Sequence, residues 1–295
     1  MAKERMAQPK GAIGGSSGRS RLLGNFDGMS KWPWWLLLAL AIACYIVFLI
    51  ITDESMRKTF WFISGQTPAG ILSGTILFKG ITITLTVAVC AYACALLIGL
   101  TFGLMRSSDN PFFYNIASFY VEIMRGIPML VLLLYVSFAL VGLFITAINS
   151  IGIPLSSRDV PMELRAIVAL GLGYGAFSAE IFRAGIQSIE SGQHEAAAAL
   201  GMSYFQKMRL IVLPQAFRRI LPALGNDFIA MVKDSSLVAI LGVQDLTQLT
   251  RLYYSGNFLY MQSLTMLAFI YLLMVVLLTR FVRWMESRLQ RAYRR

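Results

Sequence analysis

Long apolar stretches run along most of the chain, separated by short segments rich in charged residues, glycine and proline. Several of these stretches exceed the roughly 20 residues that a helix needs to cross a bilayer. We expect membrane-crossing helices over these ranges: 32–52, 74–105, 125–148, 163–187, 220–243 and 261–282. The pattern therefore predicts an all-α membrane protein of about six transmembrane helices.

The two ends of the chain and the segments between the helices are polar. Residues 1–31 are rich in Gly, Ser, Lys and Arg, and residues 286–295 are rich in Arg, as is typical of solvated tails. Between the helices we expect an inner turn at 106–111 and an amphipathic lead-in to the third helix at 112–124. We also expect outer loops at 52–74, 149–162 and 244–260, and one long polar segment at 188–219.

The composition supports a membrane location. The chain has 57% hydrophobic and only 14% charged residues, whereas about a quarter of a soluble domain is charged. Its net charge is +11, and placing both termini in the cytoplasm puts most of its Lys and Arg residues on that side. Membrane proteins show this bias. The basic excess therefore indicates topology rather than a nucleic-acid partner, and we find no nucleic-acid-binding motif.

The sequence gives no support for a metal site or a nucleotide site. Cys44, Cys90 and Cys94 all lie inside apolar stretches, and His194 is the single histidine. No Cys/His group has metal-ligand spacing. The chain also has no Gly-x-x-x-x-Gly-Lys-Ser/Thr phosphate loop. We therefore expect no bound metal and no ATPase site in this chain.

The polar segment 188–219 carries the clearest functional signal. Its first part is alanine-rich and helix-prone, and Gly201 is suited to end a helix in a left-handed conformation. Residues 204–213 can form a second short helix, which we expect Pro214 to interrupt. Two short helices around a glycine corner predict a compact knob on the cytoplasmic face.

The same segment resembles the signature of permease subunits from binding-protein-dependent ABC importers. That signature is Glu-Ala-Ala, three residues, Gly, nine residues, then Ile-x-Leu-Pro. The chain has the expected residue at every defined position, namely Glu195, Ala196, Ala197, Gly201, Ile211, Leu213 and Pro214. The resemblance implies the type I importer permease fold. It also implies that the knob is a coupling helix, which docks in a cleft of the ATPase subunit.

Other segments are similar to permeases for polar amino acids. They include Arg125-Gly126-Ile127-Pro128 and the stretches 179–186, 213–216, 225–226 and 233–237, so the resemblance covers roughly 70–285. The chain departs from the family at 173–177 and at Asp227, where the family often has Gln. The helix at 32–52 is an addition to the commoner five-helix plan.

The resemblance implies a set of partners. These are ATP-binding-cassette ATPase subunits that hold ATP and magnesium, a second permease copy or paralogue, and an extracytoplasmic substrate-binding protein. It further implies a prokaryotic plasma membrane location, a polar amino acid as substrate, and no cofactor on this chain.

Charged residues inside the predicted helices are candidates for substrate contact, because ionisable groups are costly in a bilayer. An amino acid zwitterion needs an anion for its ammonium group and a cation for its carboxylate. The candidates lie on the fourth and fifth helices and are Tyr174, Glu180, Arg183, Asn226, Asp227, Lys233 and Asp234. Alternatively, Glu180–Arg183 and Lys233–Asp234 are structural pairs that neutralise each other.

Two other classes of protein remain open at this point. A stand-alone ion-coupled carrier would use the intramembrane charges as proton or sodium sites, although we see no inverted repeat. A membrane scaffold without transport activity would leave those charges unexplained. Neither class explains why the sequence at 188–219 has the importer signature.

Overall fold

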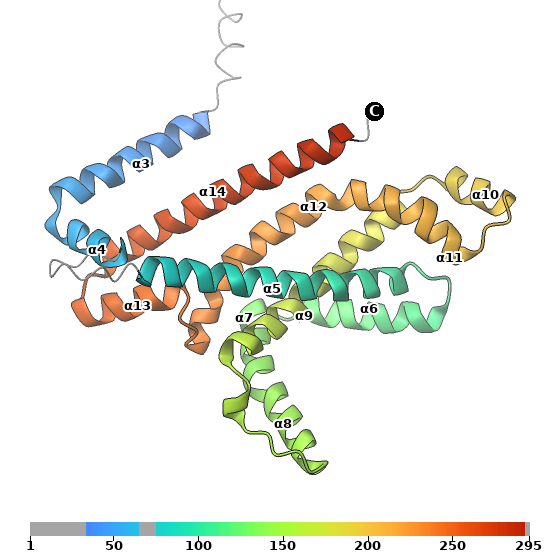
Figure 1. Ribbon diagram of the computed structural model, residues 1–295, viewed down its shortest axis with the longest axis horizontal. Coiled ribbons are helices and arrows are strands. Elements are labelled where there is room, and N and C mark those ends of the chain that lie inside the picture. The colour runs from blue at the N-terminus through green and yellow to red at the C-terminus, as the bar shows by residue number, and fades with distance from the viewer. Residues whose placement is uncertain (1–33, 65–74, 293–295) are drawn as a thin grey trace, which may run out of the picture. The chain divides into compact units, whose positions relative to one another are not determined.

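The apolar stretches of the sequence are helices in the computed structural model, which describes residues 34–64 and 75–292 and has no strand within them (Figure 1). The chain divides into two compact units, Met1–Thr52 and Asp53–Arg295. In the first unit, helix α3 (Trp34–Thr52) is apolar around its whole circumference. The predicted tail 1–31 and residues 65–74 lie outside the described part of the chain.

The second unit consists of a series of helices joined by short turns. In chain order they are α4 (Glu54–Ser64), α5 (Thr75–Arg106), α6 (Pro111–Gly126), α7 (Met129–Leu134), the π-helical turn η1 (Tyr135–Leu140), α8 (Val141–Ser150), the 3₁₀ turn η2 (Ser157–Asp159), α9 (Met162–Gln187), α10 (Ser191–Ala199), α11 (Tyr204–Lys207), the π-helical turn η3 (Met208–Val212), α12 (Leu213–Asp234), the 3₁₀ turn η4 (Ser235–Leu241), α13 (Leu246–Asn257) and α14 (Tyr260–Ala292).

Among the described residues, four helical spans are long and apolar enough to cross a membrane. They lie in α5, in the continuous rod from α7 to α8, in α9 and in α14. The predicted total of about six also needs α3 and α12, and that total stays a prediction. Helix α12 is less apolar because it carries Arg218, Arg219, Asp227 and Lys233.

The core is built on the close approach of α5 and α9. A Cβ added at Gly99 would lie 2.5 Å from the Ser178 Cβ, and one added at Gly103 would lie 2.7 Å from the Phe182 Cβ. Gly99 and Gly103 are four residues apart, so both face α9, and small residues at this spacing let helix backbones approach closely. The main apolar cluster extends this contact to α7, α12 and η4.

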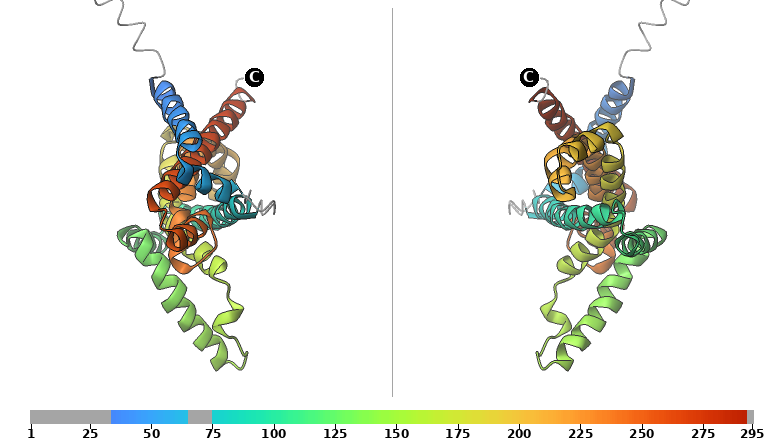
Figure 2. Two further views of the ribbon diagram at one scale, coloured as in Figure 1. Left: turned by 90° about the vertical axis from the view of Figure 1, so that its left-hand side faces the viewer. Right: turned by 90° about the vertical axis from the view of Figure 1, so that its right-hand side faces the viewer.

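Helix α8 has no buried residue, unlike the core helices α9 and α12. In the views of Figures 1 and 2, α8 projects away from the α5–α9 core. A helix that is apolar and unburied in the single chain is suited to contact lipid or another membrane chain.

Arg165 holds the base of this projecting segment. Although it is charged, Arg165 is only 4% exposed. Its guanidinium group donates to the backbone oxygens of Val160 at 3.0 Å and Ser137 at 2.9 Å, and to the Ser157 Oγ at 2.7 Å. These bonds tie the start of α9 to η1 and η2.

The predicted fifth helix, 220–243, has the wrong boundaries. Helix α12 begins at Leu213 and ends at Asp234, and the chain then tightens into η4, which is followed by Gly242 with φ of 79°. The left-handed conformation at Gly242 is accessible to glycine at little cost. Val238, Ala239 and Leu241 are therefore buried in a 3₁₀ turn rather than in an α-helix.

Two predicted outer loops contain helices. The range 52–74 contains α4, and the range 244–260 contains α13. Helix α13 is capped by the side chain of Asp245, which accepts from the backbone nitrogens of Thr247 and Gln248 at 3.1 and 2.9 Å. Its buried residues, Leu246, Thr250 and Tyr253, share one face.

Candidate functional site

The segment 188–219 forms the predicted knob. Helices α10 and α11 meet at Gly201, whose φ of 70° is the left-handed conformation that the sequence predicts. Glu195 and Ala196 are exposed on α10, whereas Ala197 is fully buried. The predictions of a short first helix and of a left-handed glycine after it are confirmed.

The prediction that Pro214 interrupts the second helix is wrong. Helices α11 and α12 are continuous through the π-helical turn η3, and Pro214 lies in the first turn of α12. A proline inside a regular helix lacks one N–H donor and clashes with the carbonyl four residues before it. The wider π turn that precedes Pro214 accommodates the ring without a break.

The knob is attached to both α9 and α12. Leu213 packs against a buried cluster that includes Ile186 and Val212. The guanidinium group of Arg219 donates to the backbone oxygen of Ser188, where α9 ends. These contacts connect any displacement of the knob to both helices.

Large apolar side chains are exposed on and beside the knob. Leu200 is 79% exposed, Phe205 is 69% exposed and Leu210 is 62% exposed. Exposed apolar groups in an otherwise polar segment are typical of a surface that another protein covers.

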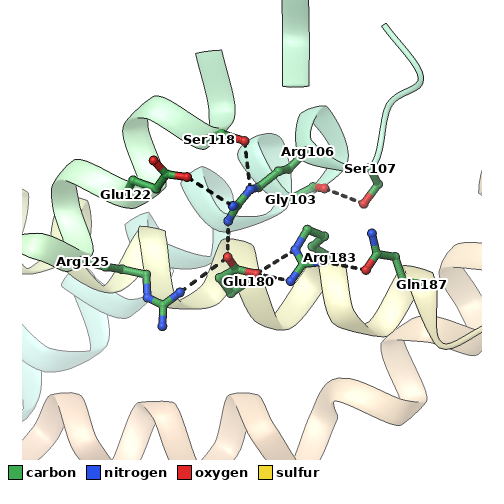
Figure 3. A network of polar contacts seen from close by, with 9 residues as sticks. All are labelled: Gly103, Arg106, Ser107, Ser118, Glu122, Arg125, Glu180, Arg183 and Gln187. Atoms are coloured by element: carbon green, nitrogen blue, oxygen red, sulfur yellow. Dashed lines mark hydrogen bonds and ion pairs between the residues drawn. The ribbon is translucent and has the colours of Figure 1, made fainter. Parts of the chain in front are cut away.

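A network of arginines surrounds Glu180 near the end of α9 (Figure 3). Its Oε1 atom accepts from Arg106 of α5 and lies 3.5 Å from the Arg125 Nη1 of α6. Its Oε2 atom accepts from the Arg183 Nε at 2.7 Å. Arg183 and Glu180 therefore do form the pair that we considered, but two further arginines share the same carboxylate.

A second set of polar contacts joins α9 to α12. The Tyr174 hydroxyl donates to the Asp234 Oδ2 at 2.9 Å, and the Ser178 Oγ donates to the Asp227 Oδ2 at 3.1 Å. We call Tyr174, Ser178, Asp227 and Asp234 the α9–α12 seam. Among the described residues, no ion pair includes either aspartate or Lys233, so the pairing of Lys233 with Asp234 is not observed.

The structure thus separates the predicted substrate residues into two groups. Tyr174, Asp227 and Asp234 meet at the seam, while Glu180 and Arg183 belong to the arginine network. Asn226 and Lys233 are exposed on α12. Ser178 was missed, although its position one helical turn after Tyr174 was a signal that the sequence contained.

An apolar cavity of about 1170 Å³ lies between α5, α9, α12 and α14. Apart from Tyr92, Arg218 and Glu286, its lining side chains are apolar. Such a lining does not suit a polar ligand, because a buried polar group needs hydrogen-bond partners. The seam is therefore the better candidate for polar contacts.

Comparison with known families identifies the chain. A family model described as "Binding-protein-dependent transport system inner membrane component" matches residues 95–291, which include α9, the knob, α12 and all but the last residue of α14. The chain belongs to this family.

Two curated proteins illustrate the relationship. The glutamine transport system permease protein GlnP of Escherichia coli (strain K12) is 32% identical over 217 residues, covering 73% of this chain and 93% of that protein. The arginine transport system permease protein ArtQ of Bacillus subtilis (strain 168) is 34% identical over 217 residues, covering 72% of this chain and 92% of that protein.

A solved structure shows the same fold. The crystal structure of an amino acid ABC transporter with histidines is 34% identical to this chain and superposes with a TM-score of 0.60. The match covers 72% of this chain and 94% of that chain. The type I importer permease fold is therefore the fold of this chain.

Proposed function

We propose that this chain is the transmembrane permease subunit of an ATP-binding-cassette importer that moves polar amino acids into the cell. The observation that carries the proposal is the knob at 188–219, which presents Glu195 and Gly201 in the family pattern on a surface with exposed apolar side chains. The relatives for glutamine and arginine support a polar amino acid as the substrate. Family membership favours this function over a stand-alone carrier.

The proposal includes partners that lie outside this chain. ATPase subunits bind ATP and magnesium and receive the knob, while this chain contributes no ATPase site and binds no cofactor. A second permease copy or paralogue completes the translocation path, and an extracytoplasmic binding protein delivers the substrate. The chain lies in a prokaryotic plasma membrane with both termini in the cytoplasm. The domain at 70–285 performs transport, and 32–52 is an added helix.

The contacts of the knob suggest how ATP hydrolysis drives transport. The knob is anchored to both α9 and α12, through Arg219 with Ser188 and through the cluster around Leu213. The same two helices carry the seam. When the ATPase subunits close, movement of the knob shifts α9 and α12 and changes which side of the membrane the seam faces. The seam aspartates would contact the ammonium group or another donor of the substrate.

Affinity purification of the chain from its native membrane tests the function. We expect an ATPase subunit to co-purify, and we expect the complex in liposomes to take up amino acid only when ATP and the binding protein are supplied. A chain that purifies alone and takes up substrate in response to a proton or sodium gradient would instead be a secondary carrier.

We predict that Asp227→Asn weakens substrate recognition. The change removes one negative charge but keeps the size of the side chain and a partner for Ser178. Loss of a charge-assisted hydrogen bond to substrate raises the KM for uptake by about tenfold or more. The measurement is ATP-driven uptake by the reconstituted complex across a range of substrate concentrations.

The matched control for this prediction is Glu163→Gln, the same chemical change at an exposed position in the first turn of α9. It is expected to leave KM unchanged. Equal KM values and an equal substrate profile for Asp227→Asn and the unmodified complex would remove Asp227 from the substrate path.

A further inference from the structure

The arginine network has more positive than negative charge in its least exposed part. The side chains of Arg106, Glu180 and Arg183 are 13%, 20% and 30% exposed, and that of Arg125 is 46% exposed. Glu122 is the second carboxylate, but it lies 3.9 Å from Arg106 and is 74% exposed. Water screens an exposed carboxylate at this distance. Glu180 therefore provides most of the compensation for three guanidinium groups.

The three helices that meet at Glu180 are not equally secured by other contacts. Helices α5 and α9 are already in close contact through Gly99 and Gly103. Helix α6 buries only Ala117 and Val121. Its other contacts centre on Tyr120, whose ring stacks on that of Phe102 at 4.1 Å and whose hydroxyl donates to the Leu172 oxygen at 2.6 Å. Of the three helices, α6 therefore has the least packing besides the network.

Loss of the Glu180 charge would act on α6 in particular. Arg125 is on α6, while Arg106 and Arg183 are on α5 and α9. Without the carboxylate, three like charges remain close together, and removal of one member of a partly buried charge group leaves uncompensated charge. The helix with the weakest packing moves to relieve the repulsion.

The arginine network joins the ends of α9 and α6, and the chain continues from these two ends into different parts of the protein. Helix α9 ends at Gln187, whose Oε1 accepts from the Arg183 Nη1 at 2.6 Å, and the knob follows directly. Helix α6 ends at Gly126, and the rod of α7 and α8 begins three residues later at Met129. The network thus connects the base of the knob with the start of that rod. Figure 3 shows Arg125 and Gln187 on opposite sides of Glu180.

We propose that Glu180 is a positioning residue that fastens α6 to the α5–α9 pair, so that movement of the knob is passed on to α6 and to the rod that follows it. This role rests on the proposed importer function. It differs from direct substrate contact, because both oxygens of Glu180 already accept from arginines. A substrate ammonium group would have to displace one of these arginines.

The test compares Glu180→Gln with the double variant Glu180→Gln/Arg125→Gln in the reconstituted complex. The first reading is the number of substrate molecules moved per ATP hydrolysed. Glu180→Gln is expected to lower this ratio by about tenfold while ATP hydrolysis continues. The double variant is expected to recover part of the loss, because it removes the cation that repels α6. Glu122→Gln, the same change at the exposed carboxylate of the network, is the matched control and is expected to keep the unmodified ratio.

The second reading is amide hydrogen exchange in the purified complex, which does not depend on transport. Exchange in 111–126 is expected to rise in Glu180→Gln and to fall again in the double variant, while α5 is unchanged. A substrate-contact role would predict no recovery, since the second change restores no carboxylate.

Each outcome decides the proposal. An unchanged ratio and unchanged exchange in Glu180→Gln would overturn it, and so would a double variant no better than the single one. If Glu180→Gln fails to assemble, recovery of assembly in the double variant supports the proposal and failure of both overturns it. An unmodified complex without ATP-driven uptake would refute the proposed function instead, and the exchange measurement would still report on α6.

Discussion

Transport is expected to be lost when Gly201 is replaced by valine. Gly201 has a φ of 70°, and a left-handed residue other than glycine costs about 1–2 kcal/mol, with β-branched side chains among the least tolerated. An added Cβ would meet nothing within 4 Å, so the penalty arises from the backbone and not from a collision. The corner then opens, and α10 presents Glu195 in the wrong direction to the ATPase subunit.

The measurement is uptake and ATP hydrolysis by the same reconstituted complex, with two controls. Gly201→Asn is expected to retain most of the transport, because asparagine tolerates the left-handed conformation. Gly192→Val places the same side chain on α10, where an added Cβ also meets nothing within 4 Å and φ is not positive. Unimpaired transport in Gly201→Val would contradict the role of the corner.

Glu195→Ala probes the same surface without changing the backbone. Glu195 is exposed, so its removal should leave the fold and the amount of protein intact. Transport is nevertheless expected to fall to background while ATP hydrolysis no longer responds to substrate. Normal uptake by Glu195→Ala and by Gly201→Val together would exclude the assignment of this knob as the coupling helix.

Folded protein is expected to be lost when Gly103 is replaced by valine. A Cβ at this position would lie 2.7 Å from the Phe182 Cβ and 2.9 Å from the Ala179 backbone oxygen. Because one of these atoms belongs to the backbone, no change of rotamer can make room. Helices α5 and α9 must separate, and overpacking of this kind costs about 3 kcal/mol or more.

The measurement is thermal unfolding of the purified chain, followed by size-exclusion chromatography. Gly142→Val is the matched control, since Gly142 lies in α8 and an added Cβ there meets nothing within 4 Å. We expect the control to keep the unmodified melting temperature. Equal melting temperatures for both variants would show that the α5–α9 contact is not tight.

Helices with long apolar runs could be located closely from the sequence. The predicted range 163–187 agrees with α9 to within one residue at its start. The agreement is close because a proline precedes the helix and a polar segment follows it. Helix α12 was harder, since Pro214, Arg218 and Arg219 give its first half the character of a loop. Helix α13 was missed because its apolar face is short and is stabilised by burial in the tertiary structure, which sequence periodicity does not reveal.

The candidate site was predicted where its chemistry is local. The knob lies within one segment, so its pattern and its glycine corner were visible in the sequence. The pair of Glu180 with Arg183 was also visible, because the two residues are three apart on one helix. Arg106 and Arg125 are 74 and 55 residues from Glu180, and only the packing of α5 and α6 on α9 brings them together.

The π-helical turn at 208–212 fixes the length of the segment that precedes α12. Such a turn contains one residue more than regular α-helical winding would use. Deleting a single residue there would restore the regular winding with little rotation of what precedes it, because the π turn already holds the extra residue within one turn. Inserting a residue into the regular winding of α12 would instead rotate everything before it by about 100° around the axis of that helix. Glu195 would then point to a different side of the chain, although every side chain of the knob was retained. The number of residues between the knob and α12 therefore carries information in its own right.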